Sequence, residues 1–165
     1  MAQFTIAHLY DEQIEDAYPM VRMAAPDLSL ERWVEFGLSA IAGEGGVLGA
    51  YSGDGTLHGV AVYCPDDRLL AGRVLRIEPM VTFELNPRSP ARAALCEALE
   101  LLAAAKGCRQ LVFHLPSRGH ADPQSDKGEG WRRLGMALET VTFVKPLKWP
   151  APQGAAAARR GANGG

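Results

Sequence analysis

The segment from Val74 to Leu102 constrains the fold of this chain most, because it combines a strand, a polar turn and a helix. Near its middle, bulky and β-branched residues alternate with polar ones, a pattern typical of a strand: Val81, Phe83 and Leu85. The dipeptide Asn86-Pro87 then ends this strand. A junction between a strand and the helix that follows it is where α/β folds bind phosphate groups.

A helix is predicted to begin directly after this turn. Ser89 is a good N-cap, and Pro90 occupies the first helical position, where its fixed φ and missing N–H cost nothing. Leucines at helical spacing then form one apolar face: Leu95, Leu99 and Leu102. Gly107 is placed to end the helix.

Positive charge gathers at the start of this helix. Arg88 and Arg92 flank the first turn, whose N–H groups already carry a partial positive charge. Two cations there are mildly unfavourable unless an anion joins them, so the pattern indicates an anion-binding site. The alternative is that both arginines point into water, where screening makes their repulsion small.

Length and composition bound the number of domains. The chain has 165 residues, enough for one domain with a real core and too few for two comfortable ones. A hydrophobic fraction of 47% with 22% charged residues is typical of a globular protein. We expect a single domain over residues 1–148 and a disordered tail over residues 149–165, where almost nothing can be buried.

Charge and apolar patterning narrow the class of partners. The net charge of −2 gives no reason to expect a nucleic-acid partner. The N-terminus lacks the basic and apolar regions of a signal peptide, and no apolar run approaches membrane-spanning length. We therefore expect a cytoplasmic protein without a membrane partner, and the sequence leaves a homodimer open.

The cysteines and histidines do not predict a metal site. The three cysteines are odd in number and lack CxxC spacing, which argues against a disulfide framework or a structural zinc site. His114, His120 and Asp122 can be read as a metal group, but their spacing matches no established ligand geometry. His114 is better placed to carry a proton, because it lies near the end of a predicted central strand.

The periodicity of the remaining chain predicts the order of its elements. Strand patterns cover Phe4–Leu9, two runs joined by the turn Ser52–Gly55, and the ranges Arg73–Leu85, Arg109–Leu115 and Leu138–Val144. Helix patterns follow the caps Asp11, Ser29 and Ser89, and the first of these helices is expected to run through Val21. Loops are expected around Pro65–Asp67 and over residues 116–130, which are rich in Gly, Pro and charge.

These elements predict an α+β (α/β) fold with a mixed central sheet and helices on both faces. The N-terminal strands form an antiparallel meander, and the helix that begins at Pro90 joins two parallel strands in a right-handed βαβ crossover. This order resembles that of the GCN5-related N-acetyltransferase (GNAT) superfamily over roughly residues 3 to 147.

Two segments carry the resemblance. Leu85–Leu95, LNPRSPARAAL, resembles the glycine-rich turn V-x-P-x-x-R-G-x-G-x-G, with Pro87 in register. Trp131–Met136, WRRLGM, resembles the family's Y-x-x-x-G-F signature. The first segment lacks the family's arginine and three glycines, whose places are taken by Pro90, Ala91, Ala93 and Leu95.

The resemblance implies an acyl-CoA-dependent N-acyltransferase that uses acetyl-CoA as co-substrate. The implied acceptor is an amine of a small molecule or of a protein. In the family, backbone amides of the turn hold the coenzyme A pyrophosphate, and an N–H of the preceding strand polarises the thioester carbonyl. The implied cofactor contacts therefore come from the strand residues Phe83 or Leu85 and from the helix start, Arg88, Ala91, Arg92 and Ala93.

Two residues are candidates for proton transfer in such a reaction. Glu78 precedes Pro79, where a bulge or bend can aim its carboxylate into the cleft between strands. His114 is the second candidate. Glu84 shares its face with Thr82 and is expected to be solvated, and the alternative for either carboxylate is a surface position.

One alternative function stays open at this point. The chain can be a non-catalytic member of the same fold that senses a ligand or binds a protein. Trp131 stands where many family members have a tyrosine that protonates the departing thiolate, and an indole N–H is too weak an acid for that role. If a slot for pantetheine exists, the strands near residues 82–85 and 111–115 should splay apart.

Overall fold

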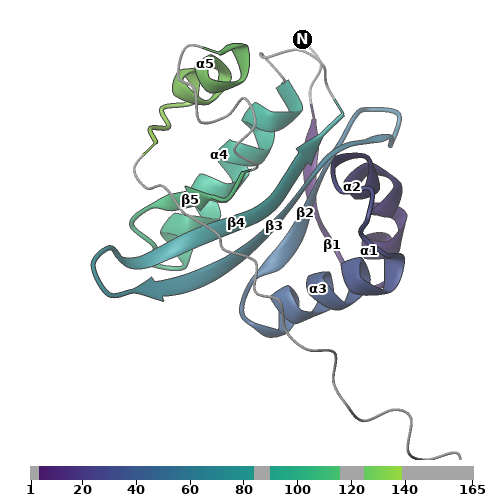
Figure 1. Ribbon diagram of the computed structural model, residues 1–165, viewed down its shortest axis with the longest axis horizontal. Helices are drawn as coiled ribbons and strands as arrows, with labels where there is room; N and C mark the ends of the chain where they lie inside the picture. Colours follow the sequence, from purple (N-terminus) through teal and green to yellow (C-terminus); the bar gives the residue numbers. More distant parts are fainter. Residues whose placement is uncertain (1–3, 84–89, 116–124, 139–165) are drawn as a thin grey trace, which may run out of the picture.

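The structure is a computed structural model and describes residues 4–83, 90–115 and 125–138. A five-stranded sheet with the order β1-β2-β3-β4-β5 forms its centre (Figure 1). Its strands are β1 (Thr5–Leu9), β2 (Gly46–Tyr51), β3 (Leu57–Arg68), β4 (Gly72–Thr82) and β5 (Leu111–Phe113). Strands β1 to β4 pair antiparallel, and β5 pairs parallel with β4. The predicted mixed sheet is thus confirmed.

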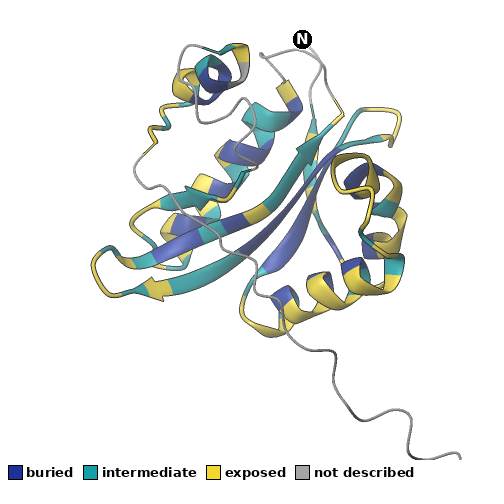
Figure 2. Cartoon of the chain, viewed as in Figure 1, coloured by how far each residue is buried: buried dark blue, intermediate teal, exposed yellow. Residues whose placement is uncertain are grey.

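Helices cover both faces of this sheet, as predicted. They are α1 (Glu12–Asp16), α2 (Tyr18–Ala24), α3 (Leu30–Ala42), α4 (Pro90–Ala105) and α5 (Asp126–Arg133). Figure 1 shows α1 to α3 on one face and α4 on the other. Two hydrophobic clusters result, one between the sheet and α1 to α3 and one beneath α4. Figure 2 shows the buried residues along the central strands and on the inward sides of the helices.

Single contacts fix how closely the helices approach the sheet. In α3, the side chain of Ser29 accepts a hydrogen bond from the N–H of Arg32, which confirms the predicted cap. Trp33 of the same helix is buried and donates from Nε1 to the carbonyl of Ile14, 2.6 Å away, which ties α3 to α1. On the other face, a Cβ at Gly59 would lie 3.0 Å from Leu95, so glycine lets α4 approach β3 closely.

The first helical segment differs from the sequence-based expectation of one helix. It is broken at Ala17, whose N–H bonds to Ile14 in a tight turn, and a second helix starts at Tyr18. Pro19 lies in the first turn of that second helix, where its missing N–H is tolerated. Asp11 precedes α1 as predicted, but its side chain makes no capping hydrogen bond.

Residues Pro65–Asp67 belong to strand β3, so the loop expected there is wrong. The β3–β4 ladder continues to the pair Arg68↔Gly72, and Gly72 takes the positive φ of 72° that the turn requires. Pro65 is tolerated because it lies opposite Leu75, whose N–H bonds to the β5 side, so the missing N–H faces the other edge. Strand β2 pairs with β3 only as far as Tyr63 and has already ended there.

The C-terminal elements also differ in their bounds. Helix α5 begins at Asp126, inside the stretch expected to be a loop, because the side chain of Ser125 caps it by accepting from the N–H of Gly128 at 3.0 Å. Strand β5 is shorter than the predicted Arg109–Leu115. Most of the strand expected over Leu138–Val144 and the tail expected over residues 149–165 lie outside the described residues.

The helices of the described ranges were also compared with the requirements of a bilayer. None of them combines the length and the hydropathy that a membrane-spanning helix needs.

Candidate functional site

A β-bulge in β4 opens one side of the sheet. On either side of it, Tyr63 pairs with Ile77 and Ala61 pairs with Met80. Two residues of β4, Glu78 and Pro79, therefore lie opposite a single residue of β3. Such a bulge bends its strand and changes the direction of the side chains next to it.

Strands β4 and β5 separate at this bulge. They pair only over Leu75–Ile77 and Leu111–Phe113, and the last bond between them runs from the N–H of His114 to the carbonyl of Ile77, 3.0 Å. From Glu78 onward, β4 makes no bond to β5 within the described ranges. We call the region beside β4 beyond Ile77, where no hydrogen bond to β5 is present within the described ranges, the gap. The strand segment over residues 84 and 85, which was also expected to splay from β5, lies outside the described residues.

The backbone direction of β4 shows which groups face this gap. The N–H of Phe83 donates to the carbonyl of His58 on β3, 2.8 Å away. Successive strand residues point their N–H groups to opposite edges, so Val81 also faces β3 while Met80 and Thr82 face the gap. Contrary to expectation, the Phe83 N–H is therefore engaged within the sheet.

A cluster of five polar side chains lies where β4 and β5 separate, and we call it the polar cluster. Its members are Asp66 and Arg68 of β3, Arg76 and Glu78 of β4, and His114 directly after β5. The structure thus brings together the two predicted catalytic residues, with Nδ1 of His114 lying 3.5 Å from Oε2 of Glu78. Both side chains are slightly under half exposed, which leaves them accessible to a substrate.

The two oxygens of the Glu78 carboxylate have different surroundings. Oε2 accepts a hydrogen bond from Nη1 of Arg76 at 3.1 Å and also faces His114. Oε1 has no hydrogen-bond partner among the described residues. Oε2 is therefore held by Arg76 and lies close to His114, while Oε1 is able to accept a proton.

The start of α4 forms the second part of the site. Pro90 has no N–H, and in a regular helix that begins there Ala93 is the first residue whose N–H has an intrahelical acceptor. The N–H groups of Ala91 and Arg92 thus have no acceptor within the helix itself. The methyl group of Ala91 is buried in the core, so only its backbone can meet a ligand. Leu85 and Arg88, which were also expected here, lie outside the described residues.

Arg92 is positioned by aromatic side chains. Its Cζ atom lies 5.1 Å from the centroid of the Trp131 ring, in a cation–π arrangement. Trp131 in turn packs on Phe113 of β5, with ring centroids 5.2 Å apart, and is only 8% exposed. The stack joins α5, α4 and β5 beside the gap and holds one cation at the start of α4.

Thiol chemistry and metal binding find little support in the described ranges. Burial raises the pKa of Cys96 to about 12, and burial also raises the pKa of Cys64, so few thiolates form near neutral pH. In the same ranges, no three His, Cys, Asp or Glu side chains are grouped as a metal ion would require. His120 and Asp122 lie outside the described residues.

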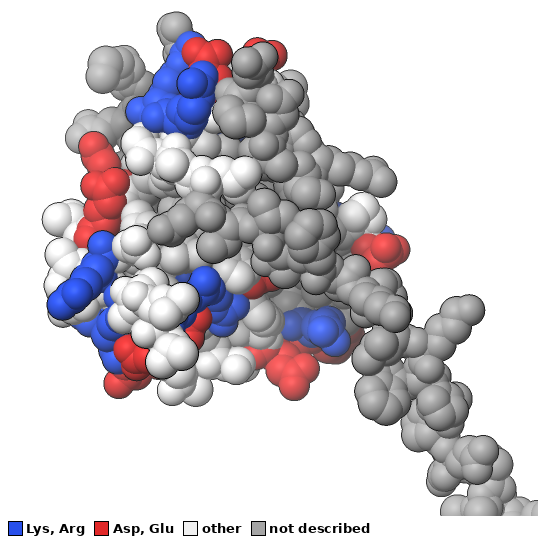
Figure 3. Space-filling model, turned by 60° about the vertical axis from the view of Figure 1, so that its left-hand side comes forward, with Lys and Arg blue, Asp and Glu red and all other residues white. Residues whose placement is uncertain are grey.

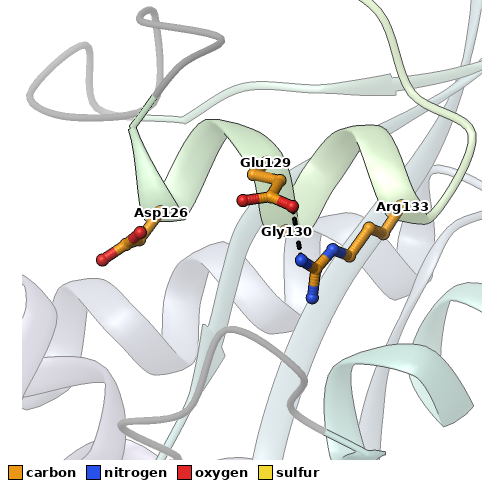
Figure 4. Close-up of a pocket in the computed structure, with 4 residues that line it drawn as sticks. All are labelled: Asp126, Glu129, Gly130 and Arg133. Carbon is orange, nitrogen blue, oxygen red and sulfur yellow. Dashed lines mark hydrogen bonds and ion pairs between the residues drawn. The ribbon is translucent and has the colours of Figure 1, made fainter.

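The surface around the site is mixed in charge. Figure 3 shows acidic side chains next to basic ones on the coloured part of one face. A shallow pocket on α5 illustrates this mixture, because it is lined by Asp126, Glu129, Gly130 and Arg133 (Figure 4). The side chains of Glu129 and Arg133 are hydrogen-bonded to each other one helical turn apart, so they neutralise each other.

Sequence reasoning missed four contributors to the site. Arg68 and Arg76 are ordinary surface arginines by pattern. Arg76 reaches Glu78 from two residues away on the same strand, whereas the strand pairing of the sheet brings Arg68 to His114. The gap-facing backbones of Met80 and Thr82 follow from the bulge, which shifts the alternation of the strand by one residue. The Glu78-Pro79 dipeptide was the one signal for that bulge.

Comparison with known proteins adds a relationship of fold. No protein-family model and no curated protein matches the sequence. Solved structures do match: an aminoglycoside N-acetyltransferase in complex with CoA superposes with a TM-score of 0.70, over 88% of this chain and 96% of that chain, at 17% identity. The chain has the GNAT fold.

Two further GNAT structures agree with this result. A ribosomal-protein-alanine N-acetyltransferase from Brucella melitensis biovar Abortus 2308 has a TM-score of 0.67 and 19% identity, over 88% of this chain and 100% of that chain. An aminoglycoside 6'-N-acetyltransferase from Acinetobacter baumannii has a TM-score of 0.69 and 14% identity over the same shares. At identities this low, the superpositions establish the shared fold alone. The acceptor substrate has to be argued from the site itself.

Proposed function

We propose that this chain is an N-acetyltransferase that moves the acetyl group of acetyl-CoA to an amine of a small molecule or a protein. The gap between β4 and β5 is the observation that carries the proposal. It begins at a bulge and lies beside Glu78, and the backbone edge of β4 at Met80 and Thr82 has no partner there among the described residues. A thioester arm that enters this gap would pair with a ready strand edge.

The residues that are present fit coenzyme A, although they do so differently from a glycine-rich turn. The N–H groups of Ala91 and Arg92 lie in the first turn of α4, where an anion is favoured. The Arg92 guanidinium, held on Trp131, adds a charge-assisted contact to a phosphate group. Side-chain charge thus takes over part of the role that backbone donors have in a glycine-rich loop.

Proton transfer is assigned to Glu78. An amine attacks a thioester carbonyl only as the neutral base, so a nearby group has to accept its proton. Oε1 of Glu78 has no partner among the described residues, whereas Oε2 accepts from Arg76 and lies 3.5 Å from Nδ1 of His114. The Glu78 carboxylate is therefore oriented through Oε2, and Oε1 is the oxygen that accepts the proton of the amine.

The remaining steps need little help from side chains. The N–H groups of Met80 and Thr82 face the gap and can stabilise the negative charge that develops on the thioester oxygen. Coenzyme A supplies a thiolate leaving group, and thiols ionise near pH 8.5, roughly, so the thiolate can depart without an acid. This removes the need for a phenol at Trp131.

Release of free coenzyme A thiol in the presence of a panel of amines tests the proposal. The panel contains aminoglycosides, amino acids and peptides with a free N-terminus. We expect turnover with at least one class, and we expect Glu78→Gln to lower kcat by roughly 10²–10⁴-fold, the usual contribution of a general base. Glu97→Gln, at an exposed position of α4, is the matched control and should retain full activity.

Two results would argue against this assignment. Equal kcat for Glu78→Gln and the native chain would remove Glu78 from the mechanism. Binding of acetyl-CoA without turnover on any amine would favour the non-catalytic ligand-sensing module instead.

A further inference from the structure

His114 has a partner on its second nitrogen, and that partner determines where the ring carries its proton. Nη2 of Arg68 lies 3.3 Å from Nε2 of His114. A guanidinium is a donor only and has no lone pair to offer. The contact is a hydrogen bond only if Nε2 carries the lone pair, so the proton of the neutral ring has to be on Nδ1.

That tautomer directs the ring toward Glu78. Nδ1 lies 3.5 Å from Oε2 of Glu78, so an N–H there points at the carboxylate oxygen that Arg76 also holds. A proton on Nε2 would place two donors against each other. In this arrangement the Nδ1–H side of His114 faces Glu78, so the ring is placed to orient the carboxylate and not to accept a proton from the amine.

Arg68 and His114 are each held by a further hydrogen bond. Nε of Arg68 donates to Oδ2 of Asp66 at 3.2 Å, which leaves Nη2 directed at the ring. The backbone N–H of His114 donates to the carbonyl of Ile77 and fixes the start of its side chain. The charged groups that face the ring within the described ranges are Asp66 and Arg68 from β3 and Arg76 and Glu78 from β4.

We propose that Arg68 is a positioning residue that fixes the Nδ1–H tautomer of His114, so that the ring orients Glu78 as the proton acceptor. This inference rests on the proposed function for its catalytic consequence, while the tautomer itself can be measured without any substrate. It assigns distinct roles to the two candidates for proton transfer: Glu78 reacts, and His114 holds it.

Long-range ¹H–¹⁵N NMR of the full chain tests the tautomer, because protonated and unprotonated imidazole nitrogens resonate in separate regions. The His114 signals are assigned by their loss in His114→Gln. At neutral pH we expect Nδ1 protonated and Nε2 unprotonated in the native chain. In Arg68→Met we expect a population with Nε2 protonated, and in Arg68→Lys, which keeps a donor, we expect the native pattern to return at least in part.

The matched control is Arg73→Met, which removes an arginine of the same hairpin that pairs with Glu44 and Asp67 and not with His114. It should leave the His114 spectrum unchanged. A protonated Nε2 in the native chain would overturn the proposal, and so would a native spectrum in Arg68→Met. Asp66→Asn, which releases Arg68, gives a second way to shift the tautomer if Arg68→Met does not fold.

Activity then separates this inference from the proposed function. We expect Arg68→Met to lower kcat about tenfold with the KM for acetyl-CoA unchanged, a small part of what a general base contributes. The expected spectra without acetyl transfer to any amine would reject the proposed function and leave the tautomer assignment standing. Acetyl transfer by a native chain whose His114 carries its proton on Nε2 would instead reject the tautomer assignment and leave the proposed function standing.

Discussion

At the residue scale, Arg92 is the residue on which phosphate binding at the start of α4 is expected to depend most. With Pro90 in the first position, the N–H groups of Ala91 and Arg92 have no acceptor within the helix, and the side chain of Arg92 adds a cation that is held on the Trp131 ring. A phosphate bound at this end should therefore depend strongly on that guanidinium.

We predict that Arg92→Met weakens binding of coenzyme A about tenfold, because a charge-assisted contact to phosphate of about 1.4 kcal/mol is lost. Methionine keeps an apolar stem against the Trp131 ring, so the stack itself should survive. Titration calorimetry provides the measurement, with Arg132→Met, an exposed arginine of α5, as the control. Unchanged affinity in Arg92→Met would show that Arg92 points to solvent, the alternative that its sequence position left open.

Individual residues of the site were predicted with uneven success. Glu78 and His114 were chosen separately from the sequence, and the structure places them in contact. The partner Arg68 could not be predicted, because its contact with His114 depends on the exact register of the strands. Arg76 lies two residues from Glu78 on the same strand, a local spacing that could have indicated the pair. Phe83 was implied by the family resemblance as a donor to the thioester, and the structure instead pairs its N–H with the carbonyl of His58.

At the scale of elements, the proposed chemistry uses the edge of β4 beyond Ile77, which has no strand partner on the β5 side among the described residues. The N–H of Thr82 faces the gap, whereas the N–H of Val81 faces β3. Proline can therefore remove the first of these donors without breaking the β3–β4 ladder.

We predict that Thr82→Pro lowers kcat/KM for acetyl-CoA by about tenfold to a hundredfold, because one donor to the bound thioester arm is lost. Urea unfolding should give a midpoint close to that of the native chain. Val81→Pro is the control for the opposite edge and should instead shift the midpoint strongly. Native kcat/KM in a folded Thr82→Pro protein would mean that the arm does not pair with this edge.

Asp54, in the turn between β2 and β3, makes the free energy of unfolding depend on pH. Hydrogen bonds from the hydroxyl of Ser52 and the N–H of Thr56 lower the pKa of Asp54 to about 2. Because the folded pKa is lower than the unfolded value of about 3.9, the carboxylate stabilises the fold above that value, and this stability is lost as the pH falls through about 2.

We therefore predict that the free energy of unfolding of Asp54→Asn falls less steeply than that of the native chain between about pH 4 and pH 2. Urea titrations at several pH values measure this slope. Asp27→Asn, at an exposed position without a side-chain hydrogen bond to a described residue, is the control and should keep the native slope. Parallel curves for Asp54→Asn and the native chain would contradict the prediction.

Local signals decided which elements were predicted well. The caps Ser29 and Pro90 and the turn Ser52–Gly55 are short-range features, and the structure confirms the helices and the hairpin that they predicted. Pro65–Asp67 has the composition of a loop, yet pairing with β4 holds it in a strand. Long-range pairing of this kind leaves no trace in local composition.

At the scale of the whole molecule, two helical layers close both faces of the sheet, and among the described residues the β4 edge beyond Ile77 has no strand partner on the β5 side. The order of elements was sufficient to predict this fold, and the solved GNAT structures confirm it. The opening itself was predicted only as a condition for function. Its position follows from one bulge, and so the substrate arm is expected to enter between β4 and β5.

Titration calorimetry of coenzyme A into the full chain tests the central claim most directly. We predict saturable one-to-one binding that weakens as the salt concentration rises, because ionic contacts to phosphate are screened. Glu78→Gln should bind as the native chain does, since Glu78 acts on the acceptor amine. The absence of any binding heat at millimolar coenzyme A, with the fold intact, would contradict the claim that this gap is an acetyl-CoA site.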